Sequence, residues 1–397
     1  MKVRPRLLWI SGLLVLGLIA LFLPAGGGSG GTGSEIPAGD QGGGEAAETQ
    51  GIAIWQGYEH HWTYNHRLNR LGDYVRTVRE SPDKVAVLDT HTGATGIGDD
   101  EGTYQSSYAF LRVNGLHALQ QEISFHFQNQ RGVASRQIRQ FTIPWEGAPA
   151  QPRVVAFING YDLIANRSAF KLQTLQMTVS HPQYNPETRQ VTCQVSASLN
   201  MRCRSLECKK FAPEYDYTLR VQVLVLMGDQ TMHAVEKHYQ QLYRWDRKAE
   251  PRVRPQADTL RGVGNRVYPN AVLGFRSLSV LLNREHWFID IGSVISPGRY
   301  QPATGLYPFD LNLFFKAWKQ GMRRHSADRL DSQFSFREKG SAVLLATVTL
   351  LQLPDGCVSN HTISGQIIWR EKGRNPRTAA AVRNDTTRFN SDCTERE

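Results

Sequence analysis

The amino-acid sequence predicts an all-β protein made of two tandem antiparallel β-sandwich modules, which follow an N-terminal hydrophobic helix and a Gly-rich linker. Many short runs between residues 107 and 353 alternate apolar and polar residues with a period of two, and clusters of Pro, Gly and Asn separate them. This alternation is typical of an antiparallel sandwich. Two blocks of the region also resemble each other, which predicts two copies of one module.

The N-terminal segment is a basic stretch followed by an unbroken apolar run, Leu7–Leu23. Lys2, Arg4 and Arg6 are expected to stay in the cytoplasm while the apolar run enters the bilayer, so the rest of the chain is extracytoplasmic. The run of about 17 residues is long for a signal-peptide core and at the lower limit for a spanning helix. Residues 1–25 are therefore a retained signal anchor with its N-terminus in the cytoplasm, which we favour, or a cleaved signal peptide of a secreted protein.

The linker and the module boundaries follow from changes in composition. Residues 26–51 are Gly-rich and have too few apolar side chains to pack, which predicts a flexible linker with a reach of about 25–30 Å. We assign the first sandwich and its N-terminal extension to residues 52–228, and the second sandwich to 265–372. Residues 229–264 form a charged connector with a helix predicted at Thr231–Lys248. Residues 373–397 are a polar tail.

The internal repeat rests on short matches at offsets of 115 to 118 residues. Its most specific element is a turn that contains both a Pro and a flanking aromatic residue. A chance match between two β-rich stretches is the alternative. The matches are Phe157 with Phe275, Asn166-Arg167 with Asn283-Arg284, Pro182 with Pro297, and Tyr184-x-Pro186-x-Thr188 with Tyr300-x-Pro302-x-Thr304.

Composition restricts the classes of partner. Hydrophobic residues make up 40% of the chain and charged residues 21%, which suffices for a sizeable core. The net charge of +10 does not indicate nucleic acid, because a translocated chain rarely meets it. A solvated basic surface, or contact with anionic glycans or lipid head groups, is the expected meaning of the charge.

The cysteines and the Asn-x-Ser/Thr triplets bear on processing. Five cysteines fit an oxidising compartment. We expect one disulfide among the first three cysteines and one between the last two cysteines, with unpaired thiols or a metal site as alternatives. The triplets matter only in a eukaryotic secretory route. The disulfide candidates are Cys193, Cys203, Cys208, Cys357 and Cys393, and the glycosylation candidates are Asn166, Asn360 and Asn384.

The order of motifs in the first module resembles the H-type lectin domain over about 90 residues. The resemblance implies a six-stranded antiparallel sandwich, often trimeric, that binds GalNAc-type or related sugars between subunits, and hence a homo-oligomer. It is weaker in the second module, and the insertion Asn200–Asp216 departs from the family pattern. The matching elements are Arg136-x-Ile138-x-x-Phe141, Pro152-x-Val154-Val155-x-Phe157, Gly160-Tyr161-Asp162-Leu163, Leu172–Val179, Thr188–Leu199 and Leu219–Met227.

The candidate ligand-binding residues combine aromatic rings with hydrogen-bonding side chains. Sugars stack their C–H faces on rings while their hydroxyls form directed hydrogen bonds. On a strand, alternate residues of the segment 58–66 share one face, which could contact a ligand. The alternative is a purely structural strand whose aromatic rings pack in the core and whose histidines face solvent. The residues predicted to bind ligand are Trp55, Tyr58, His60, Trp62, Tyr64, His66, Asp162, Arg167 and Trp287.

No motif of nucleophilic, phosphate-binding or dinucleotide chemistry occurs, and no HExxH spacing is present. We therefore predict a non-enzymatic, extracytoplasmic, membrane-tethered protein that binds a glycan or a cell-surface protein and needs no cofactor. A structural or assembly role in an envelope complex is one alternative. A metal-dependent hydrolase that uses the His-rich segment 58–67 is the other.

Overall fold

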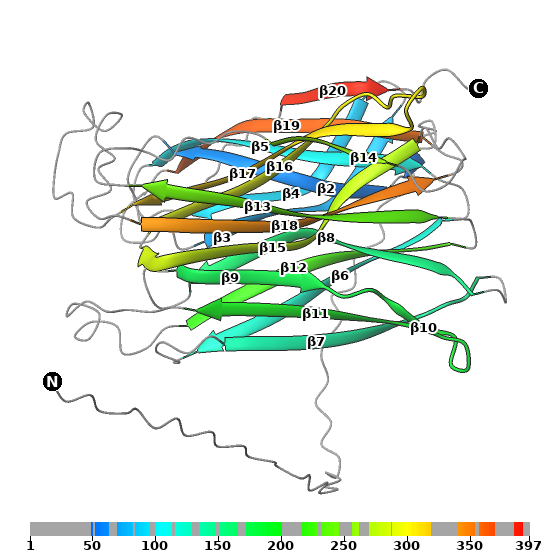
Figure 1. Ribbon diagram of the computed structural model, residues 1–397, viewed down its shortest axis with the longest axis horizontal. Helices are drawn as coiled ribbons and strands as arrows, with labels where there is room; N and C mark the ends of the chain where they lie inside the picture. Colours follow the sequence, from blue (N-terminus) through cyan, green and yellow to red (C-terminus); the bar gives the residue numbers. More distant parts are fainter. Residues whose placement is uncertain are drawn as a thin grey trace, which may run out of the picture. The chain divides into compact units, whose positions relative to one another are not determined.

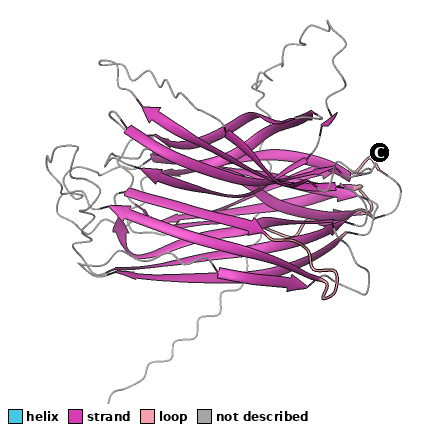
Figure 2. Cartoon of the chain, turned by 90° about the horizontal axis from the view of Figure 1, so that it is seen from above, coloured by secondary structure: helices cyan, strands magenta, loops and turns pink. Residues whose placement is uncertain are grey.

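The computed structural model describes the chain in segments, and all regular structure in them is β-strand (Figure 1, Figure 2). The described strands form two sheets, one of 13 strands and one of seven, and belong to one compact unit, residues 47–397. The predicted all-β class is confirmed. The described residues are 49–50, 52–62, 70–81, 84–95, 100–112, 116–128, 135–147, 151–165, 172–200, 216–228, 232–245, 256–261, 270–286, 288–318, 340–353, 357–369 and 385–391.

The strands described are, in chain order, β1 (Thr49–Gln50), β2 (Ile52–Trp62), β3 (Arg70–Ser81), β4 (Lys84–Thr95), β5 (Asp100–Arg112), β6 (Leu116–Gln128), β7 (Ser135–Pro144), β8 (Arg153–Ala165), β9 (Leu172–Val179), β10 (Gln183–Asn185), β11 (Gln190–Asn200), β12 (Asp216–Gly228), β13 (His233–Trp245), β14 (Gln256–Arg261), β15 (Asn270–His286), β16 (Phe288–Pro297), β17 (Leu306–Trp318), β18 (Gly340–Leu353), β19 (Cys357–Trp369) and β20 (Asp385–Ser391).

The same pattern of strand pairing occurs twice along the chain. In the first half, β12 pairs with β6 and β8, and β11 pairs with β7 and β9. In the second half, β18 pairs with β13 and β15, and β17 pairs with β14 and β16. Each half therefore contributes a six-stranded unit of two three-stranded antiparallel layers. We call β6–β12 the first unit and β13–β18 the second unit.

A bulge and a turn lie at equivalent positions of the two units. In β8, Asn159 and Gly160 lie between the pairs Ile158–Val223 and Tyr161–Val221. In β15, the extra residue is Arg276, between the pairs with Val348 and Thr347. The turns before β11 and β17 each end on a residue with positive φ, Arg189 at 51° and Gly305 at 66°. These turns carry the two Tyr-x-Pro-x-Thr motifs.

The equivalence corrects one of the predicted residue matches. Phe275 precedes the bulge of β15, as Ile158 precedes the bulge of β8, so Phe275 corresponds to Ile158 and not to Phe157. Side chains alternate between the faces of a strand, so a shift of one residue changes the face. Ile158 and Phe275 belong to the same hydrophobic cluster, whereas Phe157 belongs to another. Ile158 also pairs directly with Phe275, as expected where a two-fold relation brings equivalent residues together.

The two predicted modules, residues 52–228 and 265–372, share their sheets. β15 pairs with β8 and β9 of the first range, and β16 pairs with β2. Their buried side chains form one continuous cluster, the main core, which includes Phe125, Ile158, Leu219, Phe275 and Leu344. The prediction of two separate sandwiches is therefore corrected, because strands of one range need partners from the other to pair both edges.

The predicted helix at Thr231–Lys248 is wrong, because these residues contain β13. It pairs with β18 from His233 to Trp245 without a break in register. Tyr239 and Tyr243 are buried while His238, Gln240 and Arg244 are exposed, which is the period of a strand. The spacing that indicated a helix also fits a strand over a short window, and pairing with the apolar β18 decides between them.

The N-terminal extension joins the two units through β2. Trp55 is fully buried, and its ring lies 5.9 Å from that of Tyr161 and 5.4 Å from that of Phe275. Its backbone N–H donates to Oδ1 of Asn159 at 2.8 Å, so the bulge of β8 holds β2 in place. A second cluster, which includes Ile54, Leu111, Phe157 and Leu351, forms where β2 and β5 meet strands of both units.

The outer segments depart from the predicted boundaries in two places. Thr49–Gln50, at the end of the predicted linker, form β1 and pair with Glu80 and Arg79. Asp385–Ser391, in the predicted polar tail, form β20 on the edge of β19. The predicted hydrophobic helix Leu7–Leu23 lies outside the described residues. Within the described part of the chain, no helix has the length and hydropathy to cross a membrane.

Two glycines with positive φ allow a test of the β2 contact. Gly57 has φ +128°, and a Cβ atom there would lie 1.5 Å from the carbonyl oxygen of Ser293. We expect Gly57→Ala to lower the free energy of unfolding by roughly 3–5 kcal/mol, because it combines backbone strain with a backbone clash. Gly305 has φ +66° and open space around it, so Gly305→Ala should cost about 1–2 kcal/mol. Urea denaturation measures both, and equal effects would contradict the close contact of β2 with β16.

Candidate functional site

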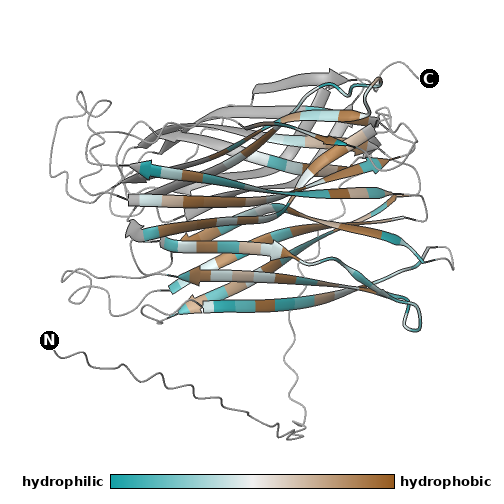
Figure 3. Cartoon of the chain, in the orientation of Figure 1, coloured by the Kyte–Doolittle hydropathy of each residue, from teal (hydrophilic) through white to brown (hydrophobic). Residues whose placement is uncertain are grey.

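Six neighbouring strands from both units form an outer face of the larger sheet. In the order β13, β18, β15, β9, β11 and β7, each pairs with the next, and Figure 1 shows them side by side. Alternate side chains point away from the main core, and Figure 3 shows the alternating hydropathy. We call the outward polar residues the polar face: Glu236, His238, Gln240, Thr347, Thr349, Ser277, Ser279, Gln176, Thr178, Gln194, Ser196 and Gln140.

Hydrogen bonds between side chains cross the strands of the polar face. Oγ of Ser277 donates to Oγ1 of Thr347 at 2.7 Å, and Nδ1 of His238 lies 2.8 Å from the same oxygen. Further along the sheet, Nε2 of Gln194 donates to Oε1 of Gln140 at 3.1 Å. The polar face therefore presents hydroxyl and amide groups that are held in register by the strands beneath them.

The densest group on this face is the His181 cluster, formed by His181, Glu236, Arg276 and Thr349. Arg276 donates from Nε to the carbonyl oxygen of Val179 at 2.9 Å and from Nη1 to Oε1 of Glu236. Nη1 also lies 2.6 Å from Nδ1 and 2.7 Å from Nε2 of His181. Thr349 Oγ1 donates to Oε1 of Glu236 at 3.3 Å.

Exposure differs sharply among the members of the His181 cluster. The side chain of His181 is 72% exposed, that of Glu236 is 24% exposed, and that of Arg276 is 9% exposed. The guanidinium therefore supports the other two groups from below, and the imidazole and one edge of the carboxylate face solvent. Arg276 can only donate hydrogen bonds, so it orients Glu236, whose other oxygen Oε2 lies 3.7 Å from Nε2 of His181.

The bulge of β15 is what brings Arg276 to this position. A bulge adds a residue to one strand and redirects its side chain. At the equivalent bulge in the first unit, Asn159 is 1% exposed and accepts from the backbone of Trp55. The equivalent position is therefore a buried amide in the first unit, where β2 covers the sheet, and a guanidinium in the second unit, where it supports a cluster on the outer face.

A second polar cluster, around Asp258 of β14, is fully used by the fold. Tyr239 donates to Asp258 Oδ2 at 2.8 Å, Nζ of Lys237 lies 2.6 Å from the same oxygen, and the backbone N–H of Thr259 donates to Oδ1 at 2.7 Å. Burial raises the pKa of Asp258, but these hydrogen bonds and the Lys237 charge outweigh it and hold the pKa below the ordinary value of 3.8. This cluster attaches β14 to β13.

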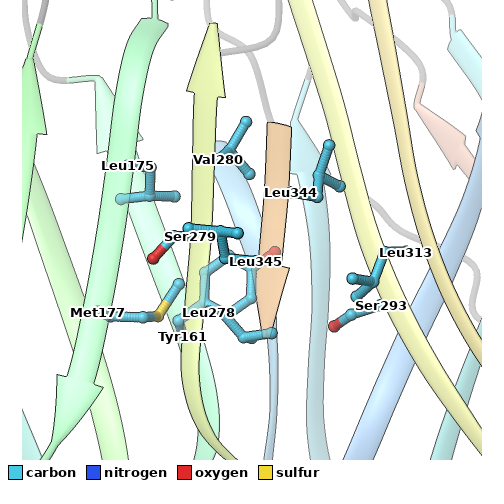
Figure 4. Close-up of a pocket in the computed structure, with 10 residues that line it drawn as sticks. All are labelled: Tyr161, Leu175, Met177, Leu278, Ser279, Val280, Ser293, Leu313, Leu344 and Leu345. Atoms are coloured by element: carbon cyan, nitrogen blue, oxygen red, sulfur yellow. The ribbon is translucent and has the colours of Figure 1, made fainter. Parts of the chain in front are cut away.

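A small cavity lies inside the sandwich where the two units meet (Figure 4). Its volume of about 20 Å³ is room for about one water molecule. The residues that line it are mostly leucine, valine and methionine, together with Tyr161, Ser279 and Ser293. The cavity is too small for a sugar or peptide, so the polar face is the better candidate for ligand binding.

The structure places two of the predicted ligand-binding residues in the interior. Trp55 and Asp162 are each 0% exposed, so neither is on an accessible surface. Tyr58, His60 and Trp62 lie in the second half of β2, and at these three positions the structure describes the backbone only. The remaining predicted residues, Tyr64, His66, Arg167 and Trp287, lie outside the described residues. The histidines proposed for a metal-dependent hydrolase are in these last two groups, and the side chains that the structure describes form no metal-binding cluster.

The predicted processing sites fall in three classes. Cys193 is a free thiol in the core, so it is not a partner in the disulfide predicted within the first three cysteines. Asn360 lies within β19 between β5 and β20, and its Oδ1 accepts from Gln56 at 3.1 Å, which does not suit glycosylation. Only the backbone of Cys357 is described. The other candidates, Cys203, Cys208, Cys393, Asn166 and Asn384, lie outside the described residues.

Sequence reasoning missed the three charged or titratable members of the His181 cluster. Glu236 fell in the segment predicted to be helical, and His181 follows a strand in a Pro-containing turn. Arg276 had no signal in the repeat either, because both units carry the bulge at this position and the offset between the blocks does not change there. Comparison of the chain with protein-family models, curated proteins and solved structures gives no match.

The Asp258 cluster predicts a specific pH dependence of stability. Because the pKa of Asp258 is lowered in the folded state, its stabilising contribution is complete above the pKa of the unfolded chain and is lost as the pH falls through the folded value. Asp258→Asn should therefore lower the free energy of unfolding at pH 7, and its difference from the wild type should shrink below about pH 4. Urea denaturation across pH measures this, with the exposed Asp310→Asn as control. A difference that is constant down to pH 3 would contradict the ion-pair geometry.

Cys193 should be chemically inert in the folded protein. Burial raises the pKa of its thiol to about 12, although the Arg276 charge opposes the shift. The thiolate is the reactive form, so iodoacetamide at pH 8 should leave Cys193 unmodified in the native protein and alkylate it after denaturation. Peptide mass spectrometry reads out this one residue. Equal modification in both states would contradict its burial.

Proposed function

We propose that this chain is a non-enzymatic extracytoplasmic protein that binds neutral glycans on the polar face, with the His181 cluster as the central contact. The observation that carries the proposal is the exposed imidazole and carboxylate edge held by the buried guanidinium of Arg276. A prearranged cluster of this kind loses little side-chain freedom when a ligand binds.

The chemistry of the cluster favours sugar hydroxyls over anions. A sugar hydroxyl both donates and accepts hydrogen bonds, so it matches the acceptor oxygens of Glu236 and the ring nitrogens of His181. An anionic ligand would meet the Glu236 carboxylate, and like charges placed together disfavour binding. The half-buried hydroxyl of Ser277, next to Arg276 on β15, adds the same chemistry beside the cluster.

The two six-stranded units support the resemblance to the H-type lectin domain, because that resemblance implies a six-stranded antiparallel sandwich. Under this proposal the protein carries two such modules joined through β15, and a homo-oligomer would multiply the weak contacts of single sites. The apolar segment Leu7–Leu23 and the Gly-rich linker would hold the binding face away from the membrane surface.

A matched pair of variants tests the glycan proposal. Both Glu236→Gln and Glu122→Gln remove a carboxylate from a strand side chain that contacts an arginine, and Glu122 lies on β6, away from the polar face. On a glycan array followed by calorimetry, we expect Glu236→Gln to weaken binding by about tenfold to 100-fold. Glu122→Gln should leave binding unchanged.

The exposed His181 provides a variant that should not affect folding. We expect His181→Ala to weaken glycan binding while the melting temperature stays that of the wild type, because its side chain is 72% exposed. Absence of binding to any neutral glycan, or equal binding by all three variants, would overturn the proposed function.

A further inference from the structure

The last strand of the polar face, β7, has an edge that no described strand covers. β7 pairs with β11 over its full length, from Ser135–Leu199 to Pro144–Gln190. Every second residue of such a strand directs its backbone N–H and C=O away from the partner, and an edge of this kind is a template for another strand. We propose that β7 binds an extended acidic segment of a partner protein by strand addition.

The side chains of β7 indicate which kind of partner strand would bind. Arg136 and Arg139 are exposed and, because side chains alternate, lie on opposite faces of the strand. Ile138 between them is 55% exposed. No acidic residue occurs within Ser135–Pro144. An added strand would therefore meet a cation on each face and one apolar contact at its centre, which matches two acidic residues three positions apart with a β-branched residue between them.

The same charges disfavour a second copy of the chain as the occupant. Two copies of β7 paired with each other would bring four arginines and no carboxylate to one strand pair. Like charges placed close together destabilise a strand pair. Arginines on an edge strand thus act against self-association and, at the same time, attract a strand of opposite charge.

The equivalent strand of the second unit is built differently. β14 has six residues where β7 has ten, and its one acidic residue, Asp258, is held by Lys237 and Tyr239. A short strand offers few backbone groups for pairing. The edge of β7 is therefore a feature of the first unit and does not follow from the repeated fold. The proposal is also independent of glycan binding at the His181 cluster, which lies on other strands.

Labelled peptides of about ten residues test strand addition on the full chain. The probes are a Glu/Val peptide with two Glu residues three positions apart, a Lys/Val peptide of the same design with Lys in place of Glu, and the Glu/Val peptide with N-methyl groups on alternate backbone amides. By fluorescence anisotropy we expect the Glu/Val peptide to bind at least about tenfold more tightly than the Lys/Val peptide, and N-methylation to abolish binding.

Charge reversal assigns the site. The variant Arg136→Glu/Arg139→Glu changes only exposed side chains and should reverse the preference, so that the Lys/Val peptide binds more tightly. The control Arg244→Glu/Arg261→Glu makes the same charge change at exposed positions of β13 and β14 and should keep the wild-type preference.

Three results would overturn the proposal. They are binding of the Glu/Val peptide that survives N-methylation, binding that both double variants weaken equally, and a dimer in light scattering that the peptide dissociates. The last result would assign the edge to a second copy of the chain. Glycan binding by the Arg136→Glu/Arg139→Glu variant, measured in parallel, separates this proposal from the proposed function.

Discussion

The pairing of β8 with β15 at Ile158 and Phe275 is the contact on which the rest of the structure depends. It joins equivalent positions of two repeated units, and the side chains of both residues enter one core together with Trp55. From this point β15 continues along β9, so the sheet passes from one unit to the other without an edge. Separation of the units would expose Phe275 and leave the backbone groups of β9 and β15 without partners, which is costly in a buried sheet.

This junction also determines where polar chemistry can occur. Both units carry a bulge directly after the junction residues, but their surroundings differ. At the first bulge, β2 covers the sheet and Asn159 serves the backbone of Trp55. At the second, Arg276 reaches the outer face and meets His181 and Glu236. Two copies of one strand arrangement have thus taken different roles, because only one of the two positions was covered by the N-terminal extension.

The candidate site shows why aromatic residues were a poor guide here. Trp55 and Asp162 were chosen because rings and carboxylates recognise sugars, yet both lie at 0% exposure. Aromatic side chains also bury large areas and contribute strongly to protein cores. The residues that reach solvent in a prearranged group, His181 and Glu236, come from segments whose patterns are unremarkable on their own. Recognition of such a group needs the pairing of strands that lie far apart in the chain.

Features that depend only on neighbours along the chain could be predicted from the sequence. Period-two alternation established the all-β class, and the Tyr-x-Pro-x-Thr motifs marked the two equivalent turns. Local pattern did not separate helix from strand at 231–248, because Val235 and Tyr239, four residues apart, fit both spacings. Leu242 fits only the helical spacing, and it is 43% exposed. The pairing of β13 with β18, the core shared by the two units, and the contact of Arg276 with a histidine 95 residues away are visible only in the folded chain. The physical reason is that hydrogen bonds between strands, and the burial of one face of a sheet, join residues that are distant in the sequence. Alternation predicts that one face of a strand is buried, but it does not identify the strand against which that face packs.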